Sequence, residues 1–226
     1  SGYLPTYAVL AVIAAIPGLV LLRYAGFIPP RVKAAAADRG GSVQDLLGSA
    51  ALRRTYITGG LIITGIDLYN FYLPIYGRSI GLSASAIGIV LGMQAAAAFA
   101  VRLWMPRLAR RFSEQRVLTA SLIIAGVTYL GFPLVENAFL LGLISFVLGL
   151  GLGCGQPLSI LLTYNHAPAN RAGEALGLRL TVNKFTEILV PIAFASLGTA
   201  AGIFPVFWAN ALLLLIGGYF SAEKRK

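Results

Sequence analysis

The chain has 226 residues, of which 58% are hydrophobic and only 12% are charged, and its formal net charge is +10. Soluble globular domains are usually about 25% charged, so this composition argues against a soluble domain and for a chain surrounded largely by lipid. The positive charge does not indicate nucleic-acid binding, because basic residues alternate between loops and aromatic residues lie in apolar runs. The single cysteine, Cys154, excludes an internal disulfide, and no metal or other cofactor is expected.

Apolar runs of membrane length recur along the whole sequence. A helix needs about 20 such residues to cross the hydrocarbon layer, and an open sheet edge in lipid would leave backbone groups unpaired. We therefore predict an all-α polytopic membrane protein. In chain order the predicted spans are Leu4–Leu22, Thr55–Tyr76 (broken or kinked near its outer end by Pro74), Ser85–Trp104, Val117–Val135, Ala138–Leu162 (tilted, or kinked near Pro157), Ala175–Leu197 and Ile203–Phe220.

The basic residues predict the orientation of these spans. Of the 18, 16 fall on one side, in or near alternate loops and the C-terminal tail, whereas Arg78 falls on the opposite side and Lys184 lies deep within a span. Because basic loops remain in the cytoplasm, we expect the N-terminus outside and the C-terminus in the cytoplasm.

The connection from Tyr24 to Arg54 is the only long one. Its sequence Ser42-Val43-Gln44-Asp45 is typical of a helix cap, and predicts a short amphipathic helix that ends at Arg54. A long linker followed by six closely spaced helices indicates a domain boundary. We therefore divide the chain into a separate first span (1–23), a cytoplasmic linker (24–54) and a six-helix bundle (55–226).

Several polar residues lie deep within the predicted spans, where charge is costly. Asp67 in the second span, and Lys184 and Glu187 in the sixth, share a depth near the middle of the membrane, at which Gln94 of the third span also lies. Asn70 shares a face with Asp67, and Asn183 shares one with Glu187. We predict that these six residues line an interior cavity.

Two interpretations of this cavity remain open. In the first, Lys184 forms a structural ion pair with Glu187 or with Asp67. In the second, the charges titrate during transport, and Asp67 couples proton movement to that of a substrate.

No arrangement of nucleophile and base is available in the membrane, so the chain is not expected to be an enzyme. The alternating glycines Gly149, Gly151, Gly153 and Gly155 are predicted to serve helix packing or bending.

Four features resemble the C-terminal half of a major facilitator superfamily transporter. The first is the long linker after a helix that would be the sixth of twelve. The second is the loop VRLWMPRLARRFSEQRVL, which is similar to the family's basic signature but lacks its Asp. The third is the glycine-rich GLGLGCGQP, and the fourth is the run PANRAGEALGLRLTVNKFTEILVP followed by GIFPVFW, which looks like the last two helices of bacterial drug-exporter-like members.

The resemblance implies that this bundle rocks against a missing N-terminal bundle of the same transporter to give alternating access. It implies proton-coupled export of small amphipathic compounds or, alternatively, proton-coupled uptake of a metabolite, in either case across a bacterial inner membrane. It also implies a cytoplasmic gate, to which we assign Arg107, Arg110, Arg111 and Arg179, although Arg179 alternatively only reaches toward the interface. The seven spans are also compatible with a seven-helix receptor or a structural membrane subunit.

Overall fold

The computed structural model describes residues 3–24 and 42–222, and within those ranges the regular structure is entirely helical. The elements are α1 (Tyr3–Arg23), α2 (Val43–Gly48), α3 (Ala50–Ser79), α4 (Ala84–Phe112), α5 (Glu114–Gly131), the 3₁₀ turn η2 (Phe132–Leu134), α6 (Ala138–Gly153), α7 (Gly155–His166), α8 (Ala172–Ala201) and α9 (Ile203–Ser221). The chain divides into two units, Ser1–Arg39 and Gly40–Lys226. The first contains α1, an apolar helix of 21 residues, and the second contains the bundle.

Five helical segments of the described residues are long and apolar enough to cross a membrane. They are Ala84–Phe112, Glu114–Leu134, Ala138–His166, Ala172–Ala201 and Ile203–Ser221. With 30 residues α3 is also long enough to cross, but Asp67 and its arginines make it less apolar. The predicted all-α membrane fold is confirmed.

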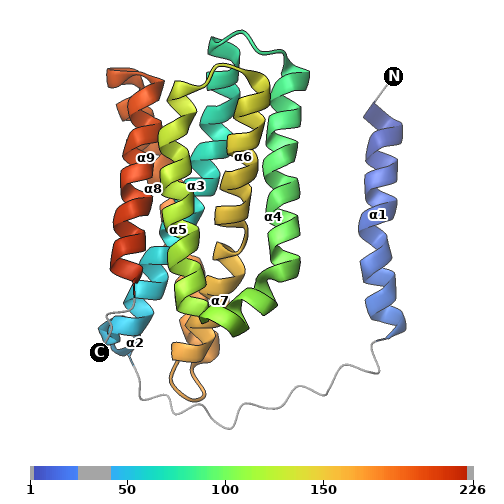
Figure 1. The fold of residues 1–226 in the computed structure, drawn as a ribbon. Helices are drawn as coiled ribbons and strands as arrows, with labels where there is room; N and C mark the ends of the chain where they lie inside the picture. The colour runs from blue at the N-terminus through green and yellow to red at the C-terminus, as the bar shows by residue number, and fades with distance from the viewer. Residues whose placement is uncertain (1–2, 25–41, 223–226) are drawn as a thin grey trace. The chain divides into compact units, whose positions relative to one another are not determined.

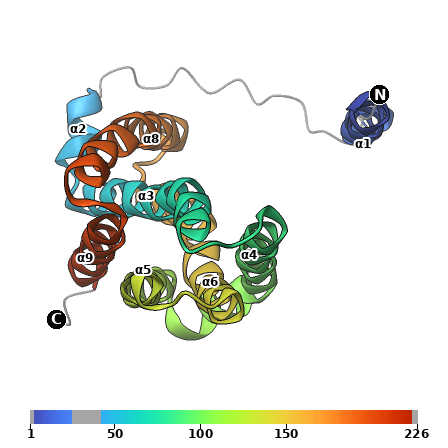
Figure 2. The ribbon, with the colours of Figure 1, turned by 90° about the horizontal axis from the view of Figure 1, so that it is seen from above.

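The bundle has α3 near its centre (Figure 1). Seen from above, α8 lies on one side of α3, and α5 and α6 lie on the other, with α9 beside α5 (Figure 2). The most extensive packing is between α4 and α6, between α5 and α9, and between α5 and α6, followed by that of α3 with α7, α8 and α9. An aromatic cluster fills the interior, in which the rings of Phe132 and Phe207 stack with centroids 5.5 Å apart.

The alternating glycines bring α6 and α7 close to three different neighbours, which confirms their predicted packing role. A Cβ added to Gly149 would lie 2.2 Å from the carbonyl oxygen of Gln94, and one added to Gly153 would lie 2.6 Å from the Cα of Ala98, both in α4. Gly151 faces α5 and Gly155 faces Ile62 of α3. Only residues without a side chain allow such close approach on several sides at once.

The long span Ala138–His166 breaks at Cys154, between α6 and α7. Proline has no N–H, so Pro157 leaves the carbonyl oxygen of Gly153 without its helical donor. Nε of Arg102, in α4, donates a hydrogen bond to this oxygen over 3.0 Å. The kink predicted near Pro157 is therefore present, and a side chain of the neighbouring helix satisfies the backbone group that the kink exposes.

Two helix boundaries differ from the predicted ones. The short helix α2 begins with the expected capping box of Ser42 and Asp45, but it ends at Gly48, and α3 already begins at Ala50. Of the break or kink expected at Pro74, the break is wrong, because α3 continues to Ser79. Burial of Leu73 and Tyr76 against the rest of the bundle holds this last part in helical form.

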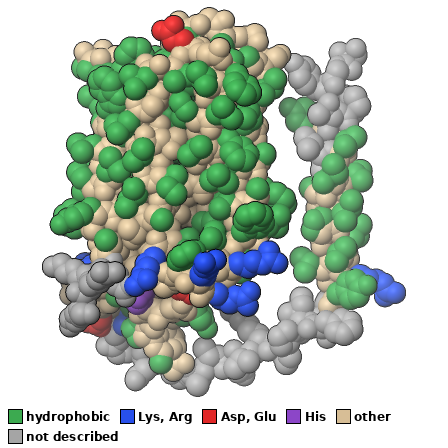
Figure 3. Space-filling model, viewed as in Figure 1, with side chains coloured by type: hydrophobic (Ala, Val, Ile, Leu, Met, Phe, Trp, Pro, Cys, Tyr) green, Lys and Arg blue, Asp and Glu red, His purple; other side chains and the backbone are tan. Residues whose placement is uncertain are grey.

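The surface of the bundle fits a bilayer. Hydrophobic side chains cover most of its height, and Lys and Arg side chains gather toward one end (Figure 3). We call this end, at which α4 ends and α5 begins with the loop that includes Ser113, the basic end. A broad apolar girdle above a basic rim is the pattern expected where a helical bundle meets anionic headgroups.

Candidate functional site

The candidate site lies where α3 packs on α8. Gly60 allows this packing, because an added Cβ would lie 3.1 Å from Oγ1 of Thr186. Two tyrosines of α3 fix the pair at either side of the site. The hydroxyl of Tyr56 donates to the carbonyl oxygen of Ala175 over 3.3 Å, and that of Tyr72 donates to the carbonyl oxygen of Phe194 over 2.9 Å.

Between these two contacts lie the three predicted ionisable groups. Nζ of Lys184 donates to Oε2 of Glu187 over 2.5 Å, and these side chains are 70% and 33% exposed. Asp67 of α3 is half-buried. The structure therefore places Asp67, Lys184 and Glu187 at one level of the packed helices α3 and α8, and it pairs Lys184 with Glu187 on its own helix.

A proline follows the polar residues of each helix by one turn. Pro74 is four residues after Asn70, and Pro191 is four residues after Glu187. Each proline removes the N–H that would bond the carbonyl oxygen of the earlier residue. Two residues of the predicted site, Asn70 and Glu187, thus carry a backbone acceptor without its helical donor. Asn70 itself is exposed.

A second polar cluster lies beside the first, between α7 and α8. Arg179 is only 3% exposed, and its guanidinium donates from Nε to Oγ of Ser159 over 3.0 Å and from Nη2 to Oε1 of Gln156 over 2.8 Å. Among the described residues no carboxylate lies within ion-pair distance of Arg179. Asn183 is 4% exposed, and its Oδ1 has no hydrogen-bond partner within the described ranges. The cluster is a buried cation held by neutral acceptors.

Gly59 of α3 makes room for this second cluster. A Cβ added there would lie 2.7 Å from Oγ of Ser159 and 3.6 Å from Oδ1 of Asn183. On α8, Arg179, Asn183 and Glu187 follow one another at intervals of four residues, so that they form one stripe. The stripe joins the two clusters into a continuous polar face.

Other predicted site residues lie apart from this face. Gln94 is half-buried in α4, which packs on α6, and it makes no hydrogen bond to the three ionisable groups. The exposed residues Arg107, Arg110 and Arg111 lie in the last part of α4, whereas Arg179 is buried against α7. The four arginines assigned to a gate thus occupy two different environments.

Sequence reasoning missed Gln156 and Ser159, the partners of Arg179. Their spacing of three residues within an otherwise apolar span places both on one face of α7, and this was the available signal. The glycines and Pro157 of the same segment are the more conspicuous pattern. In the described ranges, His, Cys, Asp and Glu residues do not gather in groups of three or more that could hold a metal ion.

Comparison with known proteins gives consistent matches. The family model described as Major Facilitator Superfamily matches residues 1–191. The cyanate transport protein CynX of Escherichia coli (strain K12) is 29% identical over 160 residues, which are 70% of this chain and 41% of that protein. The multidrug resistance protein MdtG is 26% identical in Enterobacter lignolyticus and 27% identical in Citrobacter koseri, each over 66% of this chain and over 37% and 38% of the relative. The chain spans about two fifths of the length of these curated relatives.

Proposed function

Because this chain belongs to the Major Facilitator Superfamily, we propose that it works in a secondary active transporter that moves a small organic solute by alternating access. The observation that carries this proposal is the ion pair of Lys184 and Glu187 on α8 at the same level as the half-buried Asp67 on α3. A charge near the centre of a bilayer costs about 2.5–3.5 kcal/mol. Three ionisable groups at one depth are therefore expected to have a role that offsets this cost.

We propose that this role is proton coupling. In the structure Lys184 is ion-paired with Glu187 on α8, and Asp67 lies at the same level of the neighbouring α3. Protonation of Asp67 would remove one of the two negative charges at this level and leave the ion pair of Lys184 and Glu187. A solute or a helix movement that changes this balance would then change the affinity for the proton, and linkage requires the reverse effect as well.

The open faces of α4 and α8 support a partner bundle. Only 11% of the most apolar part of α8 and 22% of that of α4 are buried within the described structure, against 56% for Ala138–His166. Gly88 and Gly92 on α4 have no neighbouring atom within 4 Å of an added Cβ among the described residues. Small residues spaced by four allow another helix to approach closely. We propose that an N-terminal bundle of the same transporter packs there.

For the solute, we favour small amphipathic compounds and an export direction. Two of the relatives are named for multidrug resistance. The apolar residues around the polar face suit such compounds. The proposed location is the bacterial inner membrane, with the basic end in the cytoplasm, because basic loops remain on that side.

A specific observation favours a second candidate, the uptake of a small anionic metabolite. Arg179 is a buried cation without a carboxylate partner among the described residues, and an arginine fork binds anionic groups well. One relative is named for the transport of cyanate, an anion. In this case Arg179 and Asn183 would receive the negative group of the solute.

The test uses the complete transporter in membrane vesicles with an imposed pH gradient. We expect Asp67→Asn to abolish proton-driven movement of a fluorescent amphipathic cation, while the exposed Glu136→Gln variant behaves like wild type. Arg179→Gln should abolish uptake of radiolabelled cyanate only if the anionic candidate is correct. Unchanged proton-driven transport in Asp67→Asn would refute the coupling role, provided that the variant is folded and inserted.

A further inference from the structure

Two adjoining hollows lie at the basic end of the bundle. The first is an apolar groove of about 430 Å³ between α3 and α9, whose walls include Ile57 and Leu61 on one side and Leu213, Ile216 and Phe220 on the other. The second is a polar pocket of about 460 Å³ among the ends of α3, α5, α7 and α9. Arg54 and Ser221 line both of them. The two hollows therefore meet at one arginine.

We propose that these hollows together bind one anionic phospholipid, with an acyl chain in the groove and the phosphate on Arg54. The inference is independent of the transport proposal, because it needs only that the bundle lies in a bilayer.

The groove has the shape and position of an acyl-chain site. Ile57 and Phe220 are 60% and 66% exposed, so the groove is open to the surroundings of the bundle. Its floor is formed where Gly217 lets α9 approach Leu61. A Cβ added to Gly217 would lie only 2.1 Å from Cδ1 of Leu61. Within a bilayer an apolar groove selects little by itself, because lipid tails are as apolar as its walls. Selectivity must come from the polar end.

Arg54 supplies that selectivity. Its side chain is exposed, and it makes neither an ion pair nor a side-chain hydrogen bond with the described residues. An arginine fork matches a phosphate group with two parallel hydrogen bonds. Arg54 lies at the end of the groove where the apolar walls stop. A phosphate bound to Arg54 would therefore place the acyl chain of the same lipid against Ile57 and Leu61.

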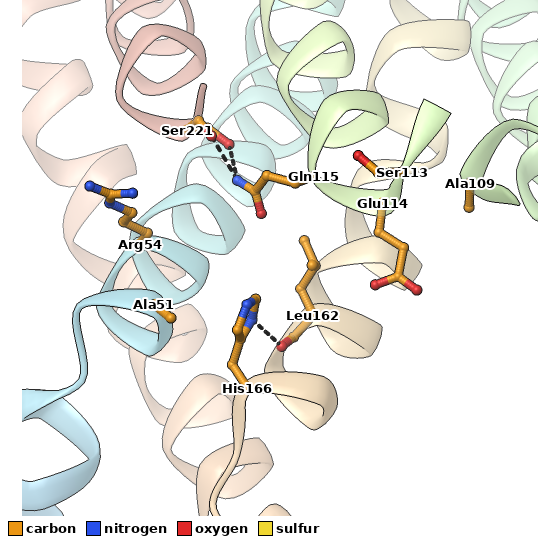
Figure 4. A pocket seen from close by; sticks show the side chains of 9 residues that line it. All are labelled: Ala51, Arg54, Ala109, Ser113, Glu114, Gln115, Leu162, His166 and Ser221. Atoms are coloured by element: carbon orange, nitrogen blue, oxygen red, sulfur yellow. Dashed lines mark hydrogen bonds between the residues drawn. The ribbon is translucent and has the colours of Figure 1, made fainter. Parts of the chain in front are cut away.

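The polar pocket suits the remainder of a headgroup (Figure 4). Nε2 of Gln115 donates to the carbonyl oxygen and to Oγ of Ser221 over 2.7 and 2.9 Å, and Nδ1 of His166 lies 2.8 Å from the carbonyl oxygen of Leu162. The carboxylate of Glu114 is on the far side of the pocket from Arg54, where it accepts a hydrogen bond from Asn165. Hydroxyl groups fit such surroundings. An added ammonium group would compete with Arg54 for the phosphate.

The experiment is native mass spectrometry of the purified full chain, released from micelles that contain equimolar phosphatidylglycerol and phosphatidylcholine. We expect wild type to retain phosphatidylglycerol about tenfold more than phosphatidylcholine, and Arg54→Gln to lose that preference. The matched control is Arg53→Gln, which removes the same charge from the adjacent exposed residue that lines neither hollow. It should keep the preference.

A second variant tests the groove without changing charge. Ile216→Trp should fill the groove and reduce retention of both lipids about as strongly as Arg54→Gln reduces that of phosphatidylglycerol. Equal retention of the two lipids by wild type, or equal losses in Arg53→Gln and Arg54→Gln, would overturn the proposal. So would full displacement of the lipid by glycerol 3-phosphate, which carries no acyl chain and would identify a site for free phosphate compounds.

Discussion

The hydroxyl of Tyr72 in α3 donates a hydrogen bond to the carbonyl oxygen of Phe194 in α8, 2.9 Å away and 122 residues along the chain. Gly198, one turn after Phe194, leaves space for the hydroxyl, because an added Cβ would lie 3.2 Å from it. The contact holds α3 and α8 together in the parts of both helices that follow the ionisable groups.

Tyr72→Phe should therefore loosen α8 without removing the packing of the ring. Hydrogen bonds between membrane helices contribute about 0.6 kcal/mol on average and up to about 1.7 kcal/mol, so we expect a loss of that order. The free energy of unfolding is measured in mixed micelles, with circular dichroism as the signal for unfolding. Tyr164→Phe is the control, since Tyr164 is exposed. An equal effect of the two variants would contradict the assignment.

Arg102→Ala should destabilise the bundle, because it leaves the carbonyl oxygen of Gly153 without a donor at the break between α6 and α7. An unsatisfied buried acceptor costs about 1–3 kcal/mol. Arg107→Ala removes the same charge from an exposed position of the same helix. We expect it to change the free energy of unfolding by less than about 0.5 kcal/mol. If both variants unfold alike, the hydrogen bond contributes no net stability.

Gly149→Ala should be strongly destabilising, because its Cβ would meet the backbone of α4 at Gln94. Backbone cannot move aside as a flexible side chain does, and overpacking usually costs about 1–3 kcal/mol or more. Gly92→Ala is the matched control in α4, with open space around the new Cβ. Thermal stability of the purified chain compares them. A tolerated Gly149→Ala would show that α4 and α6 separate easily.

Leu46→Ala should detach α2 from the bundle and leave the rest folded. A helix of six residues is not stable alone, and α2 depends on Leu46, which is 1% exposed and packs with Leu52, Tyr56 and Ala175. Hydrogen exchange should become faster in residues 43–48 and stay slow in α5. The exposed Leu47→Ala is the control. Exchange that rises throughout the bundle would indicate a core role for Leu46.

The sequence predicted the features that depend on a helix alone. Apolar length identified the spans, and the side chains of Ser42 and Asp45 predicted a cap that needs only a few consecutive residues. The predicted membrane depth of Asp67, Lys184 and Glu187 rests on the same constant rise of a helix, and it stays a prediction. The pairing of Lys184 with Glu187 was one of the two pairs expected, and it too lies within one turn.

Features that depend on neighbouring helices were harder to predict. The partners of Arg179 depend on which face of α7 meets α8, and periodicity in an apolar span does not specify this. Pro74 was expected to break a helix because it removes a backbone donor. Burial of the following turn outweighs that loss, and such burial is a property of the whole bundle. The transport roles of the site residues stay predictions.

The break at Cys154 divides one span between two sets of neighbours. Its first segment, α6, packs on α4 and α5, whereas its second, α7, packs mainly on α3, α5 and α8. A rigid rod of 29 residues would transmit any tilt at one membrane surface directly to the other. Two shorter rods that are joined at a single residue do not. A tilt of α7 with α3 and α8 is therefore not passed on directly to α6, which packs on α4.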